Sequence, residues 1–477
     1  MDQKEIFKVL ESIVGEEDVT IDPVELLAYS SDASQLKAVP VAVVRPENKE
    51  EVAEILKFAD ENRIPVTPRG AGTSTAGQSL AYKNGILMDM VKMDKILEIS
   101  LKDRIAVVQP GVIYGELNKE LRKYGYCFPP DPGSAIACTV GGMVGNNASG
   151  VRALKYGATV DHVLGLEVVL PGGKIIRTGG RVWKSSSGYN LTKLLVGSEG
   201  TLGVFTEIIL KITPIPKYSA LIVPVFEKFD QSLEAATEIT NAGILPSAME
   251  ILDDLCIMVM NSFLKEKLPQ AEALLFIEVD GNNQKAIGDE ANVVRNICEK
   301  LGAKQVIQST DPKRIEELWN LRHTLANLLA KIRGEKMAIS SIMDFAVPIS
   351  QVPEAVREMK ALAAKEQRLM AALGHIGDGN VHFGSAINVE DPKEREAATK
   401  FSRQAAEAII KRYGGTLTAE HGLGQAKSHL VMLEHGETIE LMRGIKRVFD
   451  PNNILNPMVM GLTEIPKDEY VYMPGAK

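Results

Sequence analysis

The sequence has 477 residues, more than one ordinary hydrophobic core accommodates, so we expect two or three domains. Its hydrophobic fraction of 45% and charged fraction of 24% are those of a globular protein and exclude a largely disordered chain. The formal net charge of −8 argues against a nucleic-acid-binding surface, which requires a basic stripe or patch.

The N-terminus predicts a short amphipathic helix, because charged and apolar side chains alternate there without the apolar core of a secretory signal. No stretch of the sequence reaches the roughly 20 apolar residues of a membrane-spanning helix. The four cysteines are widely spaced and form no CxxC pair, which argues against a cysteine-ligated cluster. We therefore expect a cytoplasmic location, and docking to a membrane through a partner stays open.

The first predicted elements form a β-α-β unit that ends in a glycine loop. Residues 41–44 and 65–67 predict short strands, and Asn48–Glu51 resembles a capping box that opens the helix between them. Further strands are predicted at 86–88, 105–108, 166–170 and 175–177, the last two joined as a hairpin by Pro-Gly-Gly.

The composition changes near Pro216, where we place a domain boundary. Beyond it the glycine density falls, and helical patterns appear at 232–242 and 289–301. Glycine-rich blocks return at 374–384 and 414–424.

The segment 68–77 follows a predicted strand, and its small residues allow backbone N–H groups to approach an anion closely. It is not a Rossmann fingerprint, because Thr75 occupies the position of the third glycine. It is not a Walker A loop either, because Gln78 replaces the lysine. We interpret it as a phosphate cradle, with a glycine-rich turn that binds no ligand as the alternative.

Two later segments, 130–150 and 195–204, are also rich in small residues, so their backbone can line an extended ligand. In this order the three segments resemble the FAD-binding domain of the vanillyl-alcohol-oxidase and p-cresol-methylhydroxylase flavoprotein fold. Within that fold, the sequence is similar to the D-lactate, glycolate and D-2-hydroxyglutarate dehydrogenase branch. The resemblance covers nearly the whole chain.

The resemblance implies an α+β protein with a two-part FAD-binding domain at 1–216, an α+β substrate (cap) domain with a metal site at 217–435, and a C-terminal segment, 436–477, that returns to the FAD domain. It implies noncovalent FAD, since the first histidine of the chain, His162, lies outside the first glycine segment. The residues expected to hold FAD are Pro68, Arg69, Gly70, Ala71, Gly72, Thr73, Ser74, Pro132, Gly133, Ser134, Thr139, Gly141, Gly142, Gly145, Asn146, Asn147, Ala148, Ser149, Gly150, Glu199, Gly200, Gly203 and Val204.

Three histidines lie in the later glycine-rich blocks. Glycines between His375 and His382 break any helix, so the loop can bring both imidazoles to one ion, and Glu420 can add a carboxylate. Two histidines and one carboxylate suit a catalytic divalent metal, with zinc favoured and iron or manganese as alternatives. Ordinary hydrogen-bonded histidines are the competing interpretation, and the resemblance supports the metal site by assigning the same three positions as ligands.

The resemblance places Arg322 at the substrate carboxylate, which its planar guanidinium matches; a surface ion pair is the alternative. We hypothesise that His421 is the general base. The implied reaction is oxidation of a small D-2-hydroxy acid to the 2-oxo acid by hydride transfer to flavin N5, with metal-assisted deprotonation of the hydroxyl.

D-lactate or glycolate is favoured over D-2-hydroxyglutarate, because Met343 and Gly384 stand near positions where dicarboxylate enzymes of the branch carry polar side chains. The sequence lacks an NAD fingerprint and cluster ligands, so an external electron acceptor is implied: an electron-transfer flavoprotein, an iron–sulfur subunit, a quinone or a cytochrome. A homodimer and a hetero-complex both stay open. The alternatives are a flavin-bearing electron-transfer subunit without its own substrate site, and a non-redox enzyme of the alkylglycerone-phosphate synthase type.

Overall fold

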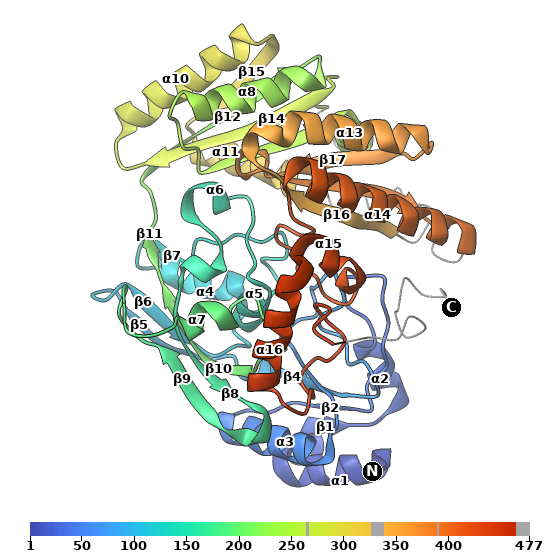
Figure 1. Ribbon diagram of the computed structural model, residues 1–477. Coiled ribbons are helices and arrows are strands. Elements are labelled where there is room, and N and C mark those ends of the chain that lie inside the picture. The colour runs from blue at the N-terminus through green and yellow to red at the C-terminus, as the bar shows by residue number, and fades with distance from the viewer. Residues whose placement is uncertain (264–266, 326–337, 389–390, 464–477) are drawn as a thin grey trace. The chain divides into compact units, whose positions relative to one another are not determined.

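The computed structural model describes the chain except for residues 264–266, 326–337, 389–390 and 464–477. The chain forms two units, each assembled from separate segments (Figure 1). Unit 1 contains Met1–Ala148, Ala158–Ile215 and Glu420–Lys477, and unit 2 contains Ser149–Gly157 and Pro216–Ala419. This division places residues 420–435 in unit 1, whereas the expected functional domains place them with the cap.

The first sheet of unit 1 has four strands in the order β1 (Val19–Thr20), β2 (Ala42–Val44), β4 (Ile86–Asp89) and β3 (Val66–Arg69). The predicted β-α-β unit is confirmed as β2, α3 (Lys49–Asn62) and β3, although β4 lies between its two strands and pairs with both in parallel. Asn48 caps α3 by accepting the N–H of Glu51 at 3.0 Å. In a capping box the side chain of Glu51 would accept the N–H of Asn48. Here it accepts the N–H of Glu47 instead.

The second sheet of unit 1 has five antiparallel strands, in the order β5 (Ile96–Ser100), β6 (Ile105–Val108), β10 (Val204–Lys211), β8 (Val163–Val169) and β9 (Ile175–Gly179). The pairing of β8 with β9 confirms the predicted hairpin. The short strands β7 (Tyr126–Cys127) and β11 (Thr213–Pro214) pair separately. The α-helices of unit 1, besides α3, are α1 (Gln3–Val14), α2 (Pro23–Tyr29), α4 (Tyr114–Arg122), α5 (Val140–Asn146), α7 (Leu191–Leu195), α15 (Val431–His435) and α16 (Ile439–Phe449).

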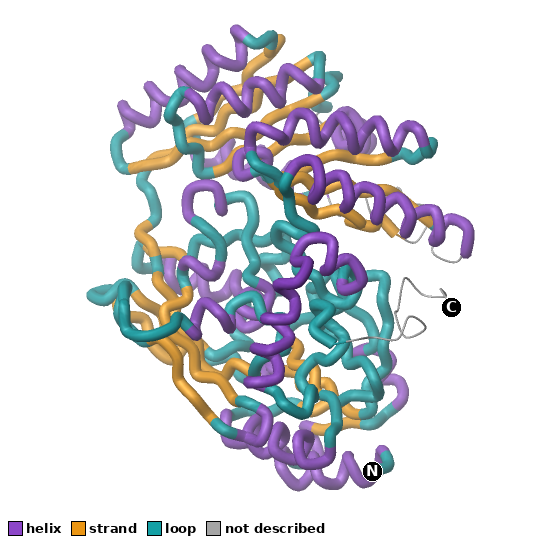
Figure 2. Tube along the Cα trace, viewed as in Figure 1, coloured by secondary structure: helices purple, strands orange, loops and turns teal. Residues whose placement is uncertain are grey.

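Unit 2 is built on one antiparallel sheet of seven strands (Figure 2). Their order is β15 (Ala303–Ser309), β12 (Tyr218–Phe226), β14 (Ala273–Gly281), β13 (Ala248–Asp253), β17 (Met370–Gly374), β18 (Asn380–Ile387) and β16 (Ala338–Ala346). Neighbouring strands are antiparallel throughout.

Helices cover both faces of this sheet, so its inner strands such as β13 and β14 are buried on both sides. One core joins the sheet to α8 (Phe229–Asn241), α10 (Gln284–Lys300), α13 (Val352–Lys365) and α14 (Pro392–Tyr413). A second core, on the opposite face, joins it to α9 (Asp254–Phe263) and α11 (Pro312–His323). The predicted helices at 232–242 and 289–301 are confirmed as α8 and α10. The short helix α6 (Ala153–Tyr156) also belongs to unit 2.

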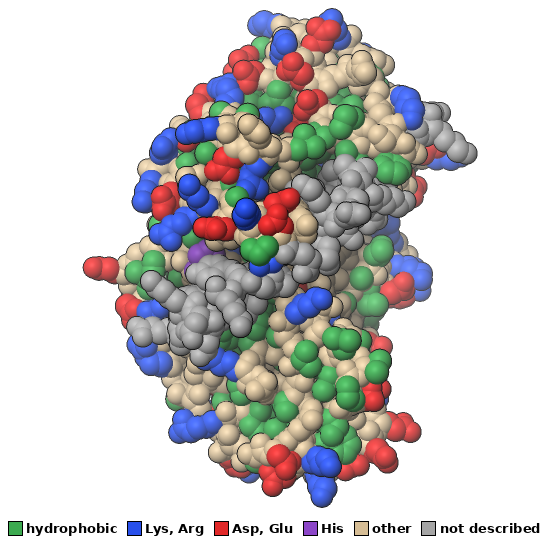
Figure 3. Space-filling model, turned by 90° about the vertical axis from the view of Figure 1, so that its right-hand side faces the viewer, with side chains coloured by type: hydrophobic (Ala, Val, Ile, Leu, Met, Phe, Trp, Pro, Cys, Tyr) green, Lys and Arg blue, Asp and Glu red, His purple; other side chains and the backbone are tan. Residues whose placement is uncertain are grey.

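The surface of the described residues carries both signs of charge. On the face shown in Figure 3, Lys and Arg side chains are interspersed with Asp and Glu side chains. None of the described helices is long and apolar enough to cross a membrane.

Candidate functional site

The first glycine segment leaves strand β3 and packs on the second segment within unit 1. A Cβ on Gly70 would lie 2.1 Å from Oγ1 of Thr139, so only glycine permits this approach. The side chain of Arg69 lies over the ring of Tyr29 and against Gly72, and its guanidinium donates to the backbone oxygens of Tyr29 and Ser79 at 3.4 Å. Arg69 therefore connects the loop to the backbone of Tyr29 and Ser79.

The glycines of the second segment have two different environments. A Cβ on Gly141 would collide with Pro110 at 2.5 Å, so this glycine serves internal packing. A Cβ on Gly133 or Gly145 would meet no heavy atom within 4 Å, so these positions border open space. Such an open, small-residue lining fits an extended cofactor such as FAD.

Glu199, in the third segment, is buried, and its carboxylate accepts the N–H groups of Leu423 and Gly424, each at 2.8 Å. Burial raises the pKa of Glu199 to about 7, although the two N–H donors and the charge of Lys427 oppose that shift. The carboxylate therefore binds the segment that follows His421.

In unit 2, polar side chains form a row across the sheet face that α9 and α11 cover. Glu250 lies on β13, His375 follows β17, His382 lies on β18 and Asp344 lies on β16. These strands are neighbours in the sheet, and the rings of His375 and His382 stand edge to face with centroids 5.2 Å apart. The sheet thus confirms the expectation that the glycine-framed loop brings these two imidazoles together.

Glu250, which is fully buried, bridges the predicted substrate arginine and one predicted metal ligand. Its Oε2 accepts Nε of Arg322 at 3.1 Å and Nη2 at 2.7 Å, and its Oε1 contacts Nδ1 of His375. Burial alone would raise the pKa of Glu250, but the charges of His375 and Arg322 outweigh burial and lower it to about 2. The bridge fixes the orientation of both side chains.

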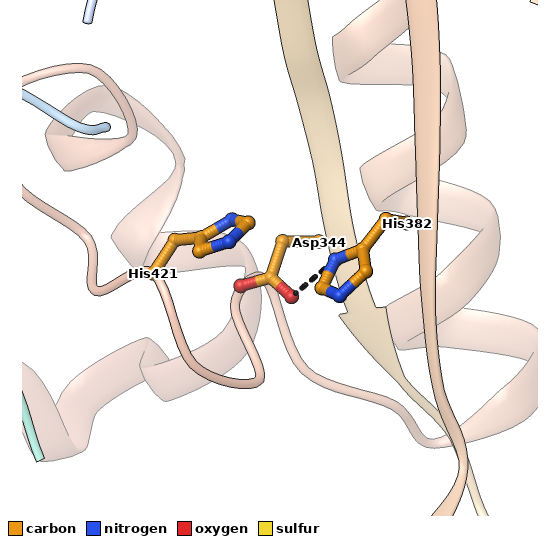
Figure 4. A group of neighbouring side chains, drawn as sticks. All are labelled: Asp344, His382 and His421. Atoms are coloured by element: carbon orange, nitrogen blue, oxygen red, sulfur yellow. Dashed lines mark ion pairs between the residues drawn. The ribbon is translucent and has the colours of Figure 1, made fainter. Parts of the chain in front are cut away.

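Asp344 lies beside His382 and binds the segment that precedes Glu420. Its Oδ1 lies 3.2 Å from Nδ1 of His382, as Figure 4 shows by a dashed line, and it also accepts Nδ2 of Asn380 at 3.0 Å. Its Oδ2 accepts the hydroxyl of Thr418 at 2.8 Å and the N–H of Ala419 at 3.1 Å. A carboxylate behind each imidazole is the arrangement that orients metal-ligating histidines in proteins.

Glu420 and His421 follow Ala419 directly along the chain and begin the C-terminal segment of unit 1. Their backbone oxygens accept side chains of unit 1: Nδ2 of Asn146 donates to Glu420 at 2.7 Å, and Nε2 of Gln78 donates to His421 at 2.8 Å. Ala419, the last residue of unit 2 before this segment, donates its N–H to Oδ2 of Asp344 at 3.1 Å.

Sequence reasoning missed two residues, Glu250 and Asp344. Both are acidic residues flanked by apolar ones within strands, in Met249-Glu-Ile-Leu252 and Met343-Asp-Phe345. A carboxylate almost never stays fully buried without a partner, and that signal could have indicated a buried polar site.

Comparison with known proteins identifies two family domains along the chain. A family model described as "FAD linked oxidases, C-terminal domain" matches residues 215–460, and one described as "FAD binding domain" matches residues 40–179. A protein named glycolate oxidase subunit GlcD from Bacillus subtilis is 36% identical over 457 residues, with 95% of this chain and 96% of that protein covered. A D-lactate dehydrogenase from Anaerostipes hadrus is 34% identical, with 88% and 89% covered.

The fold is similar to that of p-cresol methylhydroxylase solved with its substrate bound. The TM-score is 0.77 at 19% sequence identity, with 96% of each chain covered. This similarity confirms the expected α+β fold with an FAD-binding domain of this type. The chain therefore belongs to the family of FAD-linked oxidases, with an FAD binding domain followed by the C-terminal domain of that family.

Proposed function

We propose that this protein oxidises a small D-2-hydroxy acid to the 2-oxo acid with FAD, and that D-lactate or glycolate is the substrate. The observation that carries the proposal is the polar row of unit 2, where Glu250 links the guanidinium of Arg322 to the imidazole of His375. An arginine that recognises carboxylates is thus held beside two histidines suited to a metal. The family and the printed names of its relatives supply the reaction type.

The side chains have distinct roles in this proposal. The bonds to Glu250 use Nε and Nη2 of Arg322, and Nη1, which has no partner among the described residues, is directed to the substrate carboxylate. His375, His382 and Glu420 hold a divalent metal, and zinc suits this donor set, with iron or manganese as alternatives. When bound, the metal supplies positive charge that lowers the pKa of the substrate 2-hydroxyl.

His421 accepts the proton of the 2-hydroxyl on its imidazole, which suits a base working near neutral pH. FAD, when bound in the three glycine-rich segments of unit 1, supplies the acceptor for the hydride from C2. Glu250 and Asp344 orient the two metal-binding imidazoles and take no proton from the substrate.

Electrons leave the protein through an external acceptor in this proposal. Because one relative is named as a subunit of glycolate oxidase, we propose a hetero-complex whose partner carries the electrons onward. We also propose a cytoplasmic location, with any attachment to a membrane made through that partner.

The metal part of the proposal is tested with Glu250→Gln and Asp344→Asn, which keep side-chain size but remove the charge behind each imidazole. We expect each variant to bind metal about 10- to 100-fold more weakly in competition with a chelating dye, and to turn over D-lactate or glycolate more slowly at limiting metal. The control is Glu354→Gln, whose exposed carboxylate contacts Arg357 on the surface. Unchanged metal affinity in both test variants would contradict the assignment.

A further inference from the structure

The segment Glu420–Gly424, which contains the proposed base His421, is fixed along its backbone by unit 1. As described above, Asn146 donates to the backbone oxygen of Glu420 and Gln78 to that of His421. Glu199 then accepts the two N–H groups that follow, those of Leu423 and Gly424. Four backbone groups in five residues are thus held by three side chains.

Each of the three side chains lies in, or directly after, one of the three segments that are expected to line FAD. Gln78 directly follows the first segment, Asn146 ends α5 in the second, and Glu199 lies in the third. Two of them also contact each other, since Nε2 of Gln78 donates to Oδ1 of Asn146 at 2.6 Å. A single network therefore connects the cofactor-lining segments to the backbone of His421.

A fourth side chain braces this network from the C-terminal segment. Nδ2 of Asn456 donates to the backbone oxygen of Gln78 at 2.7 Å and to that of Glu199 at 2.8 Å, and Asn456 is almost fully buried. Gly424 approaches so closely that a Cβ there would lie 2.0 Å from the backbone oxygen of Ala76. The geometry leaves the segment little room to move relative to the first FAD-lining loop.

We infer that Gln78, Asn146 and Glu199 are positioning residues, which hold the backbone of His421 in register with the flavin-lining segments. The inference rests on the proposed function, because it assigns the network to the catalytic role of His421. The resemblance assigns Asn146 and Glu199 to the cofactor site. Their side chains bind the 420–424 segment, so only their backbone would line a bound cofactor. A general base displaced by about 1 Å can lose on the order of 100-fold in rate, so such bracing has a kinetic consequence.

The test compares Gln78→Met and Glu199→Gln with the natural sequence in the FAD-loaded, metal-loaded protein. The first substitution keeps the side-chain length but removes the N–H donor, whereas an amide at position 199 can accept from the two backbone N–H groups through only one atom. We expect the rate constant of flavin reduction to fall about 10- to 100-fold, with KM and FAD content changed less than about twofold. Amide hydrogen exchange of a peptide spanning residues 420–426 should become faster in both variants.

The control is Thr206→Val, which removes a buried hydrogen bond to Glu167 in unit 1, far along the chain from the 420–424 segment. It should lower stability without changing flavin reduction. The inference is overturned if both test variants reduce flavin at the natural rate, if Thr206→Val slows reduction equally, or if the variants lose FAD while exchange stays slow. If no 2-hydroxy acid reduces the flavin of the protein with the natural sequence, the proposed function is contradicted, not this inference.

Discussion

Gly422 is the residue around which the 420–424 segment is built. Its φ is +79°, and a Cβ there would lie within 2.8 Å of side-chain atoms of Asn146, Gln78 and Glu199. An L-residue would therefore meet both backbone strain and a collision with the network that holds His421.

We expect Gly422→Ala to lower the free energy of unfolding by about 1 to 3 kcal/mol and turnover by at least about 10-fold. The matched control is Gly436→Ala, at φ +51°, where a Cβ meets nothing within 4 Å. Gly436→Ala introduces the backbone strain without the collision, so it should lower the free energy of unfolding and leave turnover unchanged. Denaturant unfolding and steady-state kinetics measure the two effects, and equal loss of turnover in both variants would contradict this account.

The raised pKa of Glu199 predicts how the free energy of unfolding changes with pH. Its pKa is raised to about 7 by burial, so the native state binds this proton more tightly than the unfolded chain. The resulting stabilisation is present in acid and is lost as pH rises from about 4.5 to about 7, by up to about 3 kcal/mol. Denaturant unfolding across this range should show that contribution in the natural protein, and Glu199→Gln should lack it. Parallel pH profiles for the two proteins would show that folding does not raise the pKa of Glu199.

Among the individual residues of the candidate site, the sequence predicted some and missed others. His375 and His382 could be paired because glycines between them require a turn, and the structure places their rings together. The partners of Glu250 and Asp344 could not be predicted, because these contacts depend on which strands are neighbours, and strand order is not a local property of the sequence.

At the scale of elements, α6 shows how a segment between two parts of unit 1 is bound to unit 2. Lys155 Nζ donates to the backbone oxygen of Asp280 at 2.6 Å and pairs with its carboxylate, which also accepts the hydroxyl of Tyr156 at 2.8 Å. Arg152 adds an ion pair with Glu278 at 3.2 Å, and Glu278 accepts the indole N–H of Trp319. Strand β14 thus supplies both carboxylates that hold α6.

We expect Lys155→Met to destabilise unit 2 by about 2 kcal/mol, because the side chain of Asp280 is only 5% exposed and would lose its closest cation. Lys285→Met is the control, since its ion pair with Asp289 is exposed and contributes about 0.5 kcal/mol or less. Fluorescence of Trp319 in a Trp183→Phe background follows the unfolding of unit 2. Equal stability of the two lysine variants would show that the α6 contact contributes nothing.

Several strands of unit 1 were predictable because they are short and bounded by turn residues, but β10, the eight-residue middle strand of the second sheet, was not predicted. The sheet of unit 2 was not predictable, because helices cover both of its faces and strands such as β14 are apolar on both sides. Such runs lack the alternation that distinguishes a strand from a buried helix.

At the scale of the whole molecule, the chain leaves unit 1 twice and returns to it. The boundary after Pro216 was visible as a change in composition, and the structure divides the chain after Ile215. The resemblance implied a return at 436, whereas unit 1 resumes at Glu420. The side chains of Gln78, Asn146 and Glu199 hold this segment by hydrogen bonds with residues more than 200 positions away. Contacts of that separation leave no local pattern in the sequence.

Anaerobic reduction of the bound flavin is the direct test of the proposed oxidation of a 2-hydroxy acid. The FAD-loaded protein is mixed with D-lactate, glycolate and D-2-hydroxyglutarate, each with and without prior chelator treatment, and with L-lactate as the stereochemical control. We predict that D-lactate or glycolate bleaches the visible absorbance of the flavin fastest and that chelation abolishes the bleaching. A flavin that stays oxidised with D-lactate, glycolate and D-2-hydroxyglutarate alike would contradict the proposed dehydrogenase activity.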